Sequence, residues 1–294
     1  MTQKLGERII EAFLFISAVT AITTVALILI FLLREGLPIL AKVGIVDFAL
    51  GMRWNPIAMT GEPSYGIFPM IVGSFYVAIG SLIMAVPFGI ACAVFLAEIA
   101  PEWARSILKH AIELLVGIPS VILGFVGLVL LVPYIRDHLG GWGFSILTCS
   151  IILAIMALPR IISISDDAIR AVPKDYKEAS LALGATHWHT IKKVILPSAR
   201  SGIVAGVILA MATSIGETMV VLMVAGNVSM LPSPIYDILD PVRPMTSNIV
   251  LEMNYATGEH TQALFATGVV LFIVVAILDA ISNKVLKSRM GVER

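Results

Sequence analysis

Six long apolar blocks limit what this chain can fold into more than any other feature. A helix needs about 20 consecutive apolar residues to cross the hydrocarbon core of a bilayer. The blocks are 12–33, 66–97, 111–135, 144–164, 198–225 and 263–286. With 58% hydrophobic and 14% charged residues, the chain carries too little charge to cover a soluble domain of 294 residues. The sequence therefore predicts an all-α, polytopic membrane protein with six transmembrane helices.

Prolines mark irregularities in three of these blocks. Block 66–97 is longer than one bilayer at about 1.5 Å per residue, and Pro87 lies inside it. We therefore expect one long, tilted and kinked helix there. Pro119 lies inside the third block, and Pro159 lies near the end of the fourth.

Block 12–33 has no convincing small-residue cleavage site after it, so it is expected to be an uncleaved helix.

Charge asymmetry predicts the orientation of the six helices. Fifteen Lys and Arg residues fall on the side that holds both termini and the loop between the fourth and fifth blocks. Five fall on the other side: Arg34, Lys42, Arg53, Arg136 and Arg243. The positive-inside rule therefore predicts a multi-pass protein of the plasma or inner membrane with both termini in the cytoplasm.

Several functional classes are disfavoured by the composition and by missing motifs. A formal net charge of zero argues against a nucleic-acid partner. Cys92 and Cys149 lie inside apolar blocks and resemble small buried hydrophobes rather than a disulfide or metal site. The chain has no G-x-x-x-x-G-K-[ST], no H-E-x-x-H and no G-x-S-x-G. We therefore expect no catalytic residues, no metal and no cofactor.

The substantial amphipathic stretch on the predicted cytoplasmic side is 166–194. Ser165 is expected to cap a short helix that begins at Asp166. Pro173 suits the first turn of a second helix, which ends at Gly184. Thr186 is expected to cap a third helix, with Trp188, Ile191 and Ile195 along one side. By pattern alone, this stretch is either a helical projection that fits a groove on another protein or an interfacial helix lying on the lipid.

A sequence signature distinguishes these two readings. Glu178-Ala179-Ser180 is followed by Gly184 and then by Val194-Ile195-Leu196-Pro197. This resembles the Glu-Ala-Ala, Gly and Ile-x-Leu-Pro signature of binding-protein-dependent ABC importer permeases, with Ser180 and Val194 as conservative departures. The resemblance implies a MetI-like, type I permease core whose coupling helices dock an ATPase. The docking candidates are Glu178, Ala179, Ser180, Gly184, Leu196 and Pro197.

The same resemblance implies the partners. They are an ATPase dimer that supplies the nucleotide chemistry, an extracytoplasmic binding protein, and a second permease subunit or a second copy of this chain. Membrane lipid surrounds the complex. The implied organisation is a first helix and outer loop over residues 1–65, then a five-helix core over 66–294 with coupling helices at 166–195. Outer loops 34–65 and 226–262 are large enough to meet the binding protein, or they are simple connectors.

Further motifs resemble the permeases of phosphate importers. They are Trp54-Asn55-Pro56 with Tyr65-Gly66, Ile112-Glu113-Leu114-Leu115 with Gly117-Ile118-Pro119-Ser120-Val121, and Gly216-Glu217-Thr218-Met219 with Gly226-Asn227. The resemblance is closest to permeases of the PstC type. It implies PstA-like, PstB-like and PstS-like partners and an inorganic phosphate substrate. Substrate-pathway candidates taken from this part of the chain include Ser120, Glu217 and Thr218.

One position departs from the phosphate permeases. They typically carry Arg four residues before the Glu that matches Glu217, whereas this chain has Thr213. Three explanations are open. The partner permease supplies the missing cation, or Arg160 at the end of the fourth block stands in for it, or the substrate is another oxyanion such as molybdate, tungstate or sulfate. Glu217 either belongs to the substrate pathway or its gating, or it braces helix packing. Arg160 either meets the anion or reaches lipid headgroups. A secondary transporter or channel is a less favoured class, because it leaves the 178–197 signature unexplained.

Overall fold

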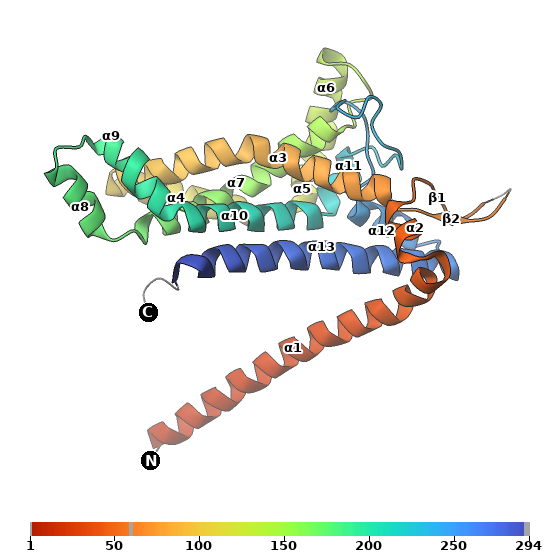
Figure 1. Cartoon of the computed structure of the whole chain (residues 1–294), viewed down its shortest axis with the longest axis horizontal. Helices are drawn as coiled ribbons and strands as arrows, with labels where there is room; N and C mark the ends of the chain where they lie inside the picture. The colour runs from red at the N-terminus through yellow and green to blue at the C-terminus, as the bar shows by residue number, and fades with distance from the viewer. Residues whose placement is uncertain (1, 59–60, 291–294) are drawn as a thin grey trace.

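A computed structural model describes residues 2–58 and 61–290 and is mostly helical (Figure 1). Six of its helical segments are long and apolar enough to cross a membrane. They are Ile10–Val43, Phe68–Ile99, Ser120–His138, Ile146–Arg170, His187–Gly216 and Glu259–Leu286. The predicted six-helix membrane fold is therefore confirmed, although several of the predicted ends shift. The division at residues 65 and 66 stays a prediction.

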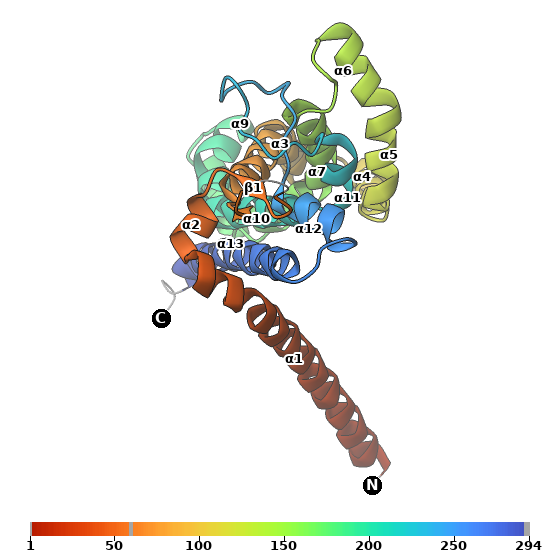
Figure 2. The same cartoon turned by 90° about the vertical axis from the view of Figure 1, so that its right-hand side faces the viewer.

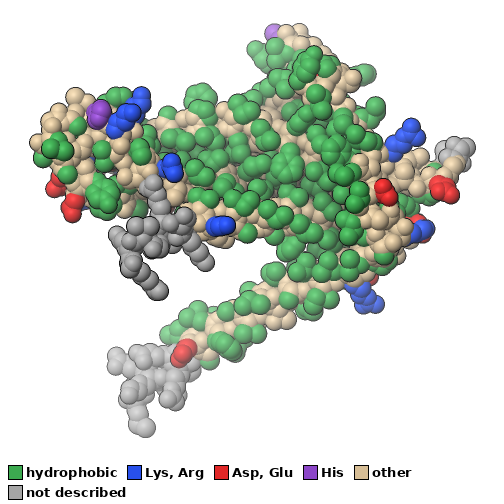
Figure 3. Space-filling view, viewed as in Figure 1, with side chains coloured by type: hydrophobic (Ala, Val, Ile, Leu, Met, Phe, Trp, Pro, Cys, Tyr) green, Lys and Arg blue, Asp and Glu red, His purple; other side chains and the backbone are tan. Residues whose placement is uncertain are grey.

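Four long helices run side by side through the body. They are α3 (Phe68–Val94), α7 (Ile146–Arg170), α10 (Leu196–Gly216) and α13 (Glu259–Met290). Helix α1 (Thr2–Val43) contacts α13 near one end of the bundle and diverges from the body toward its N-terminus (Figures 1 and 2). The charge asymmetry predicts that this end faces outward, and we call it the outer end and the opposite one the inner end. The rings of Phe31 and Phe265 meet edge-on at 5.3 Å in this contact. On the face shown in Figure 3, hydrophobic side chains cover most of the surface between the two ends of the molecule.

Small residues let α10 approach α7 closely. A Cβ added at Gly202 would lie 2.5 Å from the Ala168 side chain, and one at Gly206 would lie 2.8 Å from Ile164. Small residues at such crossings allow two membrane helices to pack backbone to backbone. The Gly202–Gly206 pair therefore packs within this chain.

The third predicted span is broken where Pro119 lies. Helix α4 (Glu102–Val116) ends before Gly117, and α5 (Ser120–Val126) begins after Pro119. A wide π-helical turn (Gly127–Leu131) and α6 (Val132–His138) complete the crossing. Proline lacks an N–H and disfavours helical conformation in the preceding residue. The expected continuous helix over 111–135 is therefore wrong, because its first residues belong to the separate, exposed α4.

The fourth span passes the end that the sequence predicts. Helix α7 continues to Arg170, so Ser165 is a buried helix residue and not a cap. Arg170 Nε donates to Asp166 Oδ1 at 2.8 Å, and Arg170 Nη2 donates to the Leu96 carbonyl at 2.7 Å. These bonds stabilise the last turn against the inner end of the second span. Pro159 is accommodated within the helix, as membrane helices permit.

The fifth span ends earlier than expected. Helix α10 stops at Gly216, and the short α11 (Met219–Val224) follows after a break at Glu217 and Thr218. The expected end at residue 225 is therefore wrong for a continuous helix. Helices α8 (Lys174–Ala182) and α9 (His187–Thr190) precede this span, and a wide turn (Ile191–Ile195) leads into α10.

The outer end is built from short packed elements. Helix α2 (Ile45–Leu50) is followed by strand β1 (Trp54–Asn55), which pairs antiparallel with β2 (Ser64–Tyr65). Helix α12 (Met245–Met253) lies between the last outer loop and α13. Phe48, Ile67, Met70 and Met245 are fully buried together beneath these elements. The two long outer loops are therefore folded structures with their own core.

Candidate functional site

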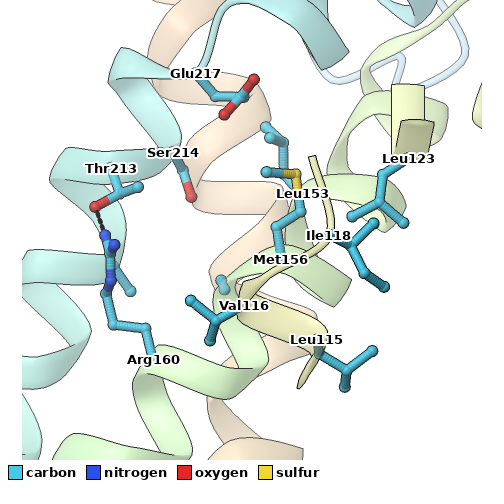
Figure 4. Close-up of a pocket in the computed structure, with 12 residues that line it drawn as sticks. Leu115, Val116, Ile118, Leu123, Leu153, Met156, Arg160, Thr213, Ser214 and Glu217 are labelled. Atoms are coloured by element: carbon cyan, nitrogen blue, oxygen red, sulfur yellow. Dashed lines mark hydrogen bonds between the residues drawn. The ribbon is translucent and has the colours of Figure 1, made fainter. Parts of the chain in front are cut away.

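A cavity of about 130 Å³ lies where the two helix breaks meet α7 (Figure 4). Its polar lining is Arg160, Thr213, Ser214 and Glu217. The remaining lining is apolar and comes from α4 and α5, α7 and α10: Leu115, Val116, Ile118, Leu123, Leu153, Met156, Ala157 and Ala210. Broken helices around a cavity are a recurrent way to present polar groups inside a membrane.

Arg160 points into this cavity from the middle of α7. Its guanidinium donates a hydrogen bond to Thr213 Oγ1 on α10 (Figure 4). Thr213 in turn donates to the Leu209 carbonyl at 3.0 Å, so its hydroxyl accepts and donates at once. Among the residues that the structure describes, no carboxylate is paired with Arg160. The cavity therefore contains a cation that is held in place without being neutralised.

The predicted location of Arg160 at a helix end is wrong. Helix α7 runs on for ten residues beyond it, about 15 Å of helix. The side chain lies against α10 and does not reach toward the inner headgroups from a helix terminus. The register of α7 against α10 brings positions 160 and 213 together, and no local sequence pattern reports that register.

Glu217 lies in the break and not inside a span. Its Oε1 accepts hydrogen bonds from the backbone N–H groups of Met219 at 3.1 Å and Val220 at 3.5 Å. Its own carbonyl accepts a hydrogen bond from Thr246 Oγ1 at 2.8 Å. The carboxylate therefore caps the first turn of α11 while also lining the cavity. These contacts favour the bracing role over direct attraction of an anion.

The structure brings only some of the pathway candidates together. Arg160, Thr213 and Glu217 line one cavity, and neither Ser120 nor Thr218 is among its lining residues. Thr218 Oγ1 donates to the Gly216 carbonyl at 3.3 Å within the break. Ser214 is a lining residue that our candidate set lacked; it is 5% exposed and its hydroxyl lies 3.5 Å from that of Ser81.

The second candidate surface is the projecting pair α8 and α9, at the opposite end of the molecule from the hairpin formed by β1 and β2 (Figure 1). Glu178, Ala179 and Gly184 are exposed on it, as is Pro197 at the start of α10. Leu196 and Ser180 are half-buried. The pair extends beyond the bundle with an exposed rim.

Gly184 and Ser180 have different structural tasks. Gly184 has a φ of +84°, and an added Cβ there would meet nothing within 4 Å. The position therefore needs glycine for its left-handed backbone and not for a close approach to another residue. Ser180 does make a close contact, since its hydroxyl lies 2.9 Å from that of Thr190 and joins α8 to the segment after it. Thr186 caps α9 as predicted, by accepting from the His189 N–H.

A half-buried carboxylate anchors this pair to the second span. Glu98 Oε2 accepts from Lys177 Nζ at 2.5 Å and lies 3.5 Å from His187 Nε2. Its side chain is 10% exposed. Sequence reasoning missed this contact, because Glu98 is 79 residues away from Lys177. Ile191 and Ile195 are buried as one face, whereas Trp188, expected beside them, is 62% exposed.

The chain is a six-span helical bundle. It has a small polar cavity between broken helices and an exposed helix pair at one end. These features are those of an integral membrane transport subunit, and comparison with known proteins identifies the family. A family model described as the inner membrane component of binding-protein-dependent transport systems matches residues 85–292. The chain belongs to that family and is a permease subunit of an ABC importer in a bacterial-type inner or plasma membrane.

Two curated relatives cover most of the chain. The probable ABC transporter permease protein YqgH of Bacillus subtilis (strain 168) is 41% identical over 286 residues, covering 96% of this chain and 89% of that protein. The phosphate transport system permease protein PstC of Pasteurella multocida is 34% identical over 250 residues, covering 78% of this chain and 76% of that protein. Both matches agree with the family resemblance read from the sequence.

A solved structure agrees in fold. The permease chain of the inward-facing MetNI methionine ABC transporter aligns with a TM-score of 0.55 at 21% identity, over 76% of this chain and 94% of that chain. The MetI-like fold is thereby confirmed. ABC importer permeases act with a partner permease, an ATPase and a binding protein, and they do not themselves catalyse a reaction. This assignment replaces the secondary-transporter and channel alternatives.

Proposed function

We propose that this chain is a permease subunit for inorganic phosphate and that Arg160 is the cationic group that meets the anion. The main support is the geometry of the cavity. A guanidinium lies in a cavity that two helix breaks help to line, is oriented by Thr213, and has no paired carboxylate among the described residues. Arg is well suited to oxyanions because its planar N–H groups match two oxygens at once.

The names of the relatives favour phosphate as the substrate, and the location of Arg160 explains how Thr213 can replace the usual Arg. Relatives named as phosphate permeases match three quarters or more of this chain. Arg160 contacts the side chain at position 213, where phosphate permeases typically carry their Arg. In this proposal the positive charge is therefore kept in the cavity but is supplied from α7.

A second candidate is transport of another oxyanion, such as molybdate, tungstate or sulfate. It is supported by the smaller hydroxyl at position 213 and by a relative whose name specifies no substrate. The two candidates share a cavity and differ in what the binding protein delivers.

The proposed partners follow the same resemblance. A PstB-like ATPase pair docks on α8 and α9, where Glu178, Ala179 and Gly184 are exposed. A PstS-like binding protein meets the outer elements, and a PstA-like permease or a second copy of this chain completes the pathway. Both termini are proposed to be cytoplasmic. Of the fifteen basic residues behind that assignment, the side chains of Lys4, Arg8, Lys287, Arg289 and Arg294 lie outside the described residues.

The test is anion uptake by the complete complex in proteoliposomes, with Arg160→Gln compared with wild type. A hydrogen bond to a charged group contributes about 1.5–3 kcal/mol, so we expect phosphate uptake at subsaturating binding protein to fall by about tenfold or more. Arg160→Lys should retain part of the activity. Arg136→Gln is the matched control, because Arg136 is an exposed outer Arg paired with Asp137. Unchanged uptake by Arg160→Gln would refute the role of Arg160.

The substrate is tested separately with the wild-type complex. ATP hydrolysis is measured with binding protein loaded with phosphate, molybdate, tungstate or sulfate. Phosphate-loaded protein is expected to stimulate hydrolysis most. Stimulation by molybdate-loaded protein but not by phosphate-loaded protein would replace the first candidate with the second.

A further inference from the structure

A buried carboxylate, Glu252, joins three separate parts of the outer end. Glu252 is 6% exposed and lies at the outer end of α12. Its Oε2 accepts from Trp54 Nε1 in β1 at 2.8 Å and lies 2.8 Å from His260 Nε2 in α13. Its Oε1 accepts from Arg243 Nη1 at 2.7 Å. The first strand, the last outer loop and the sixth span therefore meet at one side chain.

The network continues from Glu252 along α12 toward the cavity. Arg243 also donates to the Asn227 carbonyl at 2.7 Å and to Asn248 Oδ1 at 3.2 Å. Ser247 donates to Asn227 Oδ1. Ser247 and Asn248 are completely buried. Burial first, and the nearby Glu252 charge second, raise the pKa of the Tyr255 hydroxyl beside this cluster.

The inner end of α12 is bonded to the helix break that lines the cavity. Thr246 Oγ1 donates to the Glu217 carbonyl at 2.8 Å, and the Met245 N–H donates to Ser74 Oγ at 2.9 Å. Residues 246 and 252 are separated by about 9 Å along the helix axis. One short helix therefore has the outer network at one end and the cavity wall at the other (Figures 1 and 2).

We infer that α12 mechanically links the outer face to the break at Glu217, with Glu252 as the positioning residue that fixes α12 to the hairpin and α13. This inference rests on the proposed function, because the break borders the proposed anion cavity. In it, a partner that displaces the hairpin or the last outer loop shifts α12 as a unit, and the shift pulls on the Glu217 carbonyl.

Two physical features support a transmitting element over a static brace. Buried hydrogen bonds hold together the groups that they join, so Glu252, Arg243 and the residues bonded to them move as one body. The Asn248 side-chain N–H₂ is buried without a hydrogen-bond partner among the described residues, which leaves one donor that this arrangement does not satisfy. Packed interfaces of this kind switch between discrete arrangements more readily than they deform continuously.

The first experiment follows backbone hydrogen exchange in the assembled complex in lipid nanodiscs, with no substrate present. Glu252→Gln and the milder Trp54→Phe should raise exchange about tenfold in the peptide over residues 217–224, while the peptide over residues 174–190 stays unchanged. Glu259→Gln is the matched control, since its carboxylate contacts Lys42 and Tyr65 and has no bond to α12 in the described structure. Unchanged exchange over 217–224 in both test variants would overturn the inference.

The second experiment measures ATP hydrolysis with and without phosphate-loaded binding protein. Glu252→Gln and Thr246→Val should each lower the stimulated rate about fivefold and leave the basal rate unchanged. If Glu252 and Thr246 act through one linked element, the stimulated rate of the double variant Glu252→Gln/Thr246→Val should be no lower than that of the more impaired single variant. Thr246→Ser, which keeps the hydroxyl, should restore stimulation.

The outcomes separate this inference from the proposed function. The linkage would be overturned if the variants lowered the basal and the stimulated rates by the same factor. It would also be overturned if the double variant lowered the stimulated rate by the product of the two single effects. A wild-type complex that phosphate-loaded protein fails to stimulate would overturn the phosphate assignment. The exchange experiment, which needs no substrate, would then decide the linkage alone.

Discussion

At the scale of single residues, the contact between Arg160 and Thr213 relates the sequence to the chemistry of the cavity. The sequence shows that the expected cation is missing at position 213 and that Arg160 is unusual. It cannot show that the two side chains meet, because they are 53 residues apart and on different helices. For Glu217 the sequence shows the residue but not its structural role. It is visible as an ionisable residue in an apolar block, yet its task as a cap depends on a helix break that hydropathy does not reveal.

The hydroxyl of Thr213 should matter less than the charge of Arg160. Thr213→Val keeps the side-chain shape and removes the acceptor that orients the guanidinium. The bond from the guanidinium to this hydroxyl is charge-assisted, and such a bond contributes about 1.5–3 kcal/mol. Because Thr213→Val leaves the guanidinium and its charge in place, the apparent Michaelis constant for uptake of the proposed anion should rise severalfold, which is less than the loss expected for Arg160→Gln. Thr218→Val is the control, because Thr218 bonds within the break and does not line the cavity. Equal effects from both variants would show that Thr213 acts only through helix stability.

Gly184 offers a test of backbone conformation at the proposed docking surface. Its φ of +84° is strained for residues with a Cβ, at about 1–2 kcal/mol, and Asn tolerates it better than most. Retention of the ATPase during purification should therefore follow the order Gly, Asn, Ala, Val at this position. A ranking by side-chain size would contradict the backbone explanation, since nothing lies within 4 Å of the added Cβ.

At the scale of elements, the boundaries that follow local rules were predicted well. Pro173, Gly184 and Thr186 bound α8 and α9 as expected, because caps and left-handed ends are local features. Pro119 marked an irregularity in the third block but not a complete break, and the break at residues 217–218 was missed. An apolar block continues through a break without a change in hydropathy. Ser165 was misread as a cap because the bonds that extend α7 come from Arg170 to a distant carbonyl.

The link between the exposed pair α8 and α9 and the second span should depend on Glu98. Glu98→Gln removes the charge that Lys177 and His187 share, although the side chain stays nearly the same size. We expect uptake per ATP hydrolysed to fall severalfold while the basal hydrolysis rate is retained. Glu102→Gln, an exposed change in the next helix, should leave the ratio unchanged. If Glu98→Gln also keeps the wild-type ratio, this ion pair plays no part in coupling.

At the scale of the whole molecule, the distribution of charge follows the long axis. On the face shown in Figure 3, most charged side chains lie toward the two ends, and the surface between them is largely apolar. The predicted class and the number of spans needed only this pattern and the lengths of the blocks. The folded outer end was not predicted, because its core joins residues from the first outer loop to others nearly 200 positions later, such as Trp54 and Glu252.

The orientation of the bundle gives a separate prediction. In a variant with Cys92 and Cys149 replaced by Ala, a cysteine at position 182 in α8 should react with a membrane-impermeant maleimide only in inside-out vesicles. A cysteine at position 230, in the last outer loop, should react only in right-side-out vesicles. Ala182 and Met230 are both exposed, so access to water is not limiting. Reversed labelling would refute the cytoplasmic assignment of the termini.

The meeting of positions 160 and 213 also has an evolutionary consequence. Two guanidiniums in contact inside one small cavity would repel each other, whereas one is enough to keep the positive charge. Arg at either position therefore makes Arg at the other unnecessary and costly. Among homologues, the two positions should covary, with Arg at one and a small or hydroxyl residue at the other. A lineage could then move the charge across the cavity wall by two point substitutions.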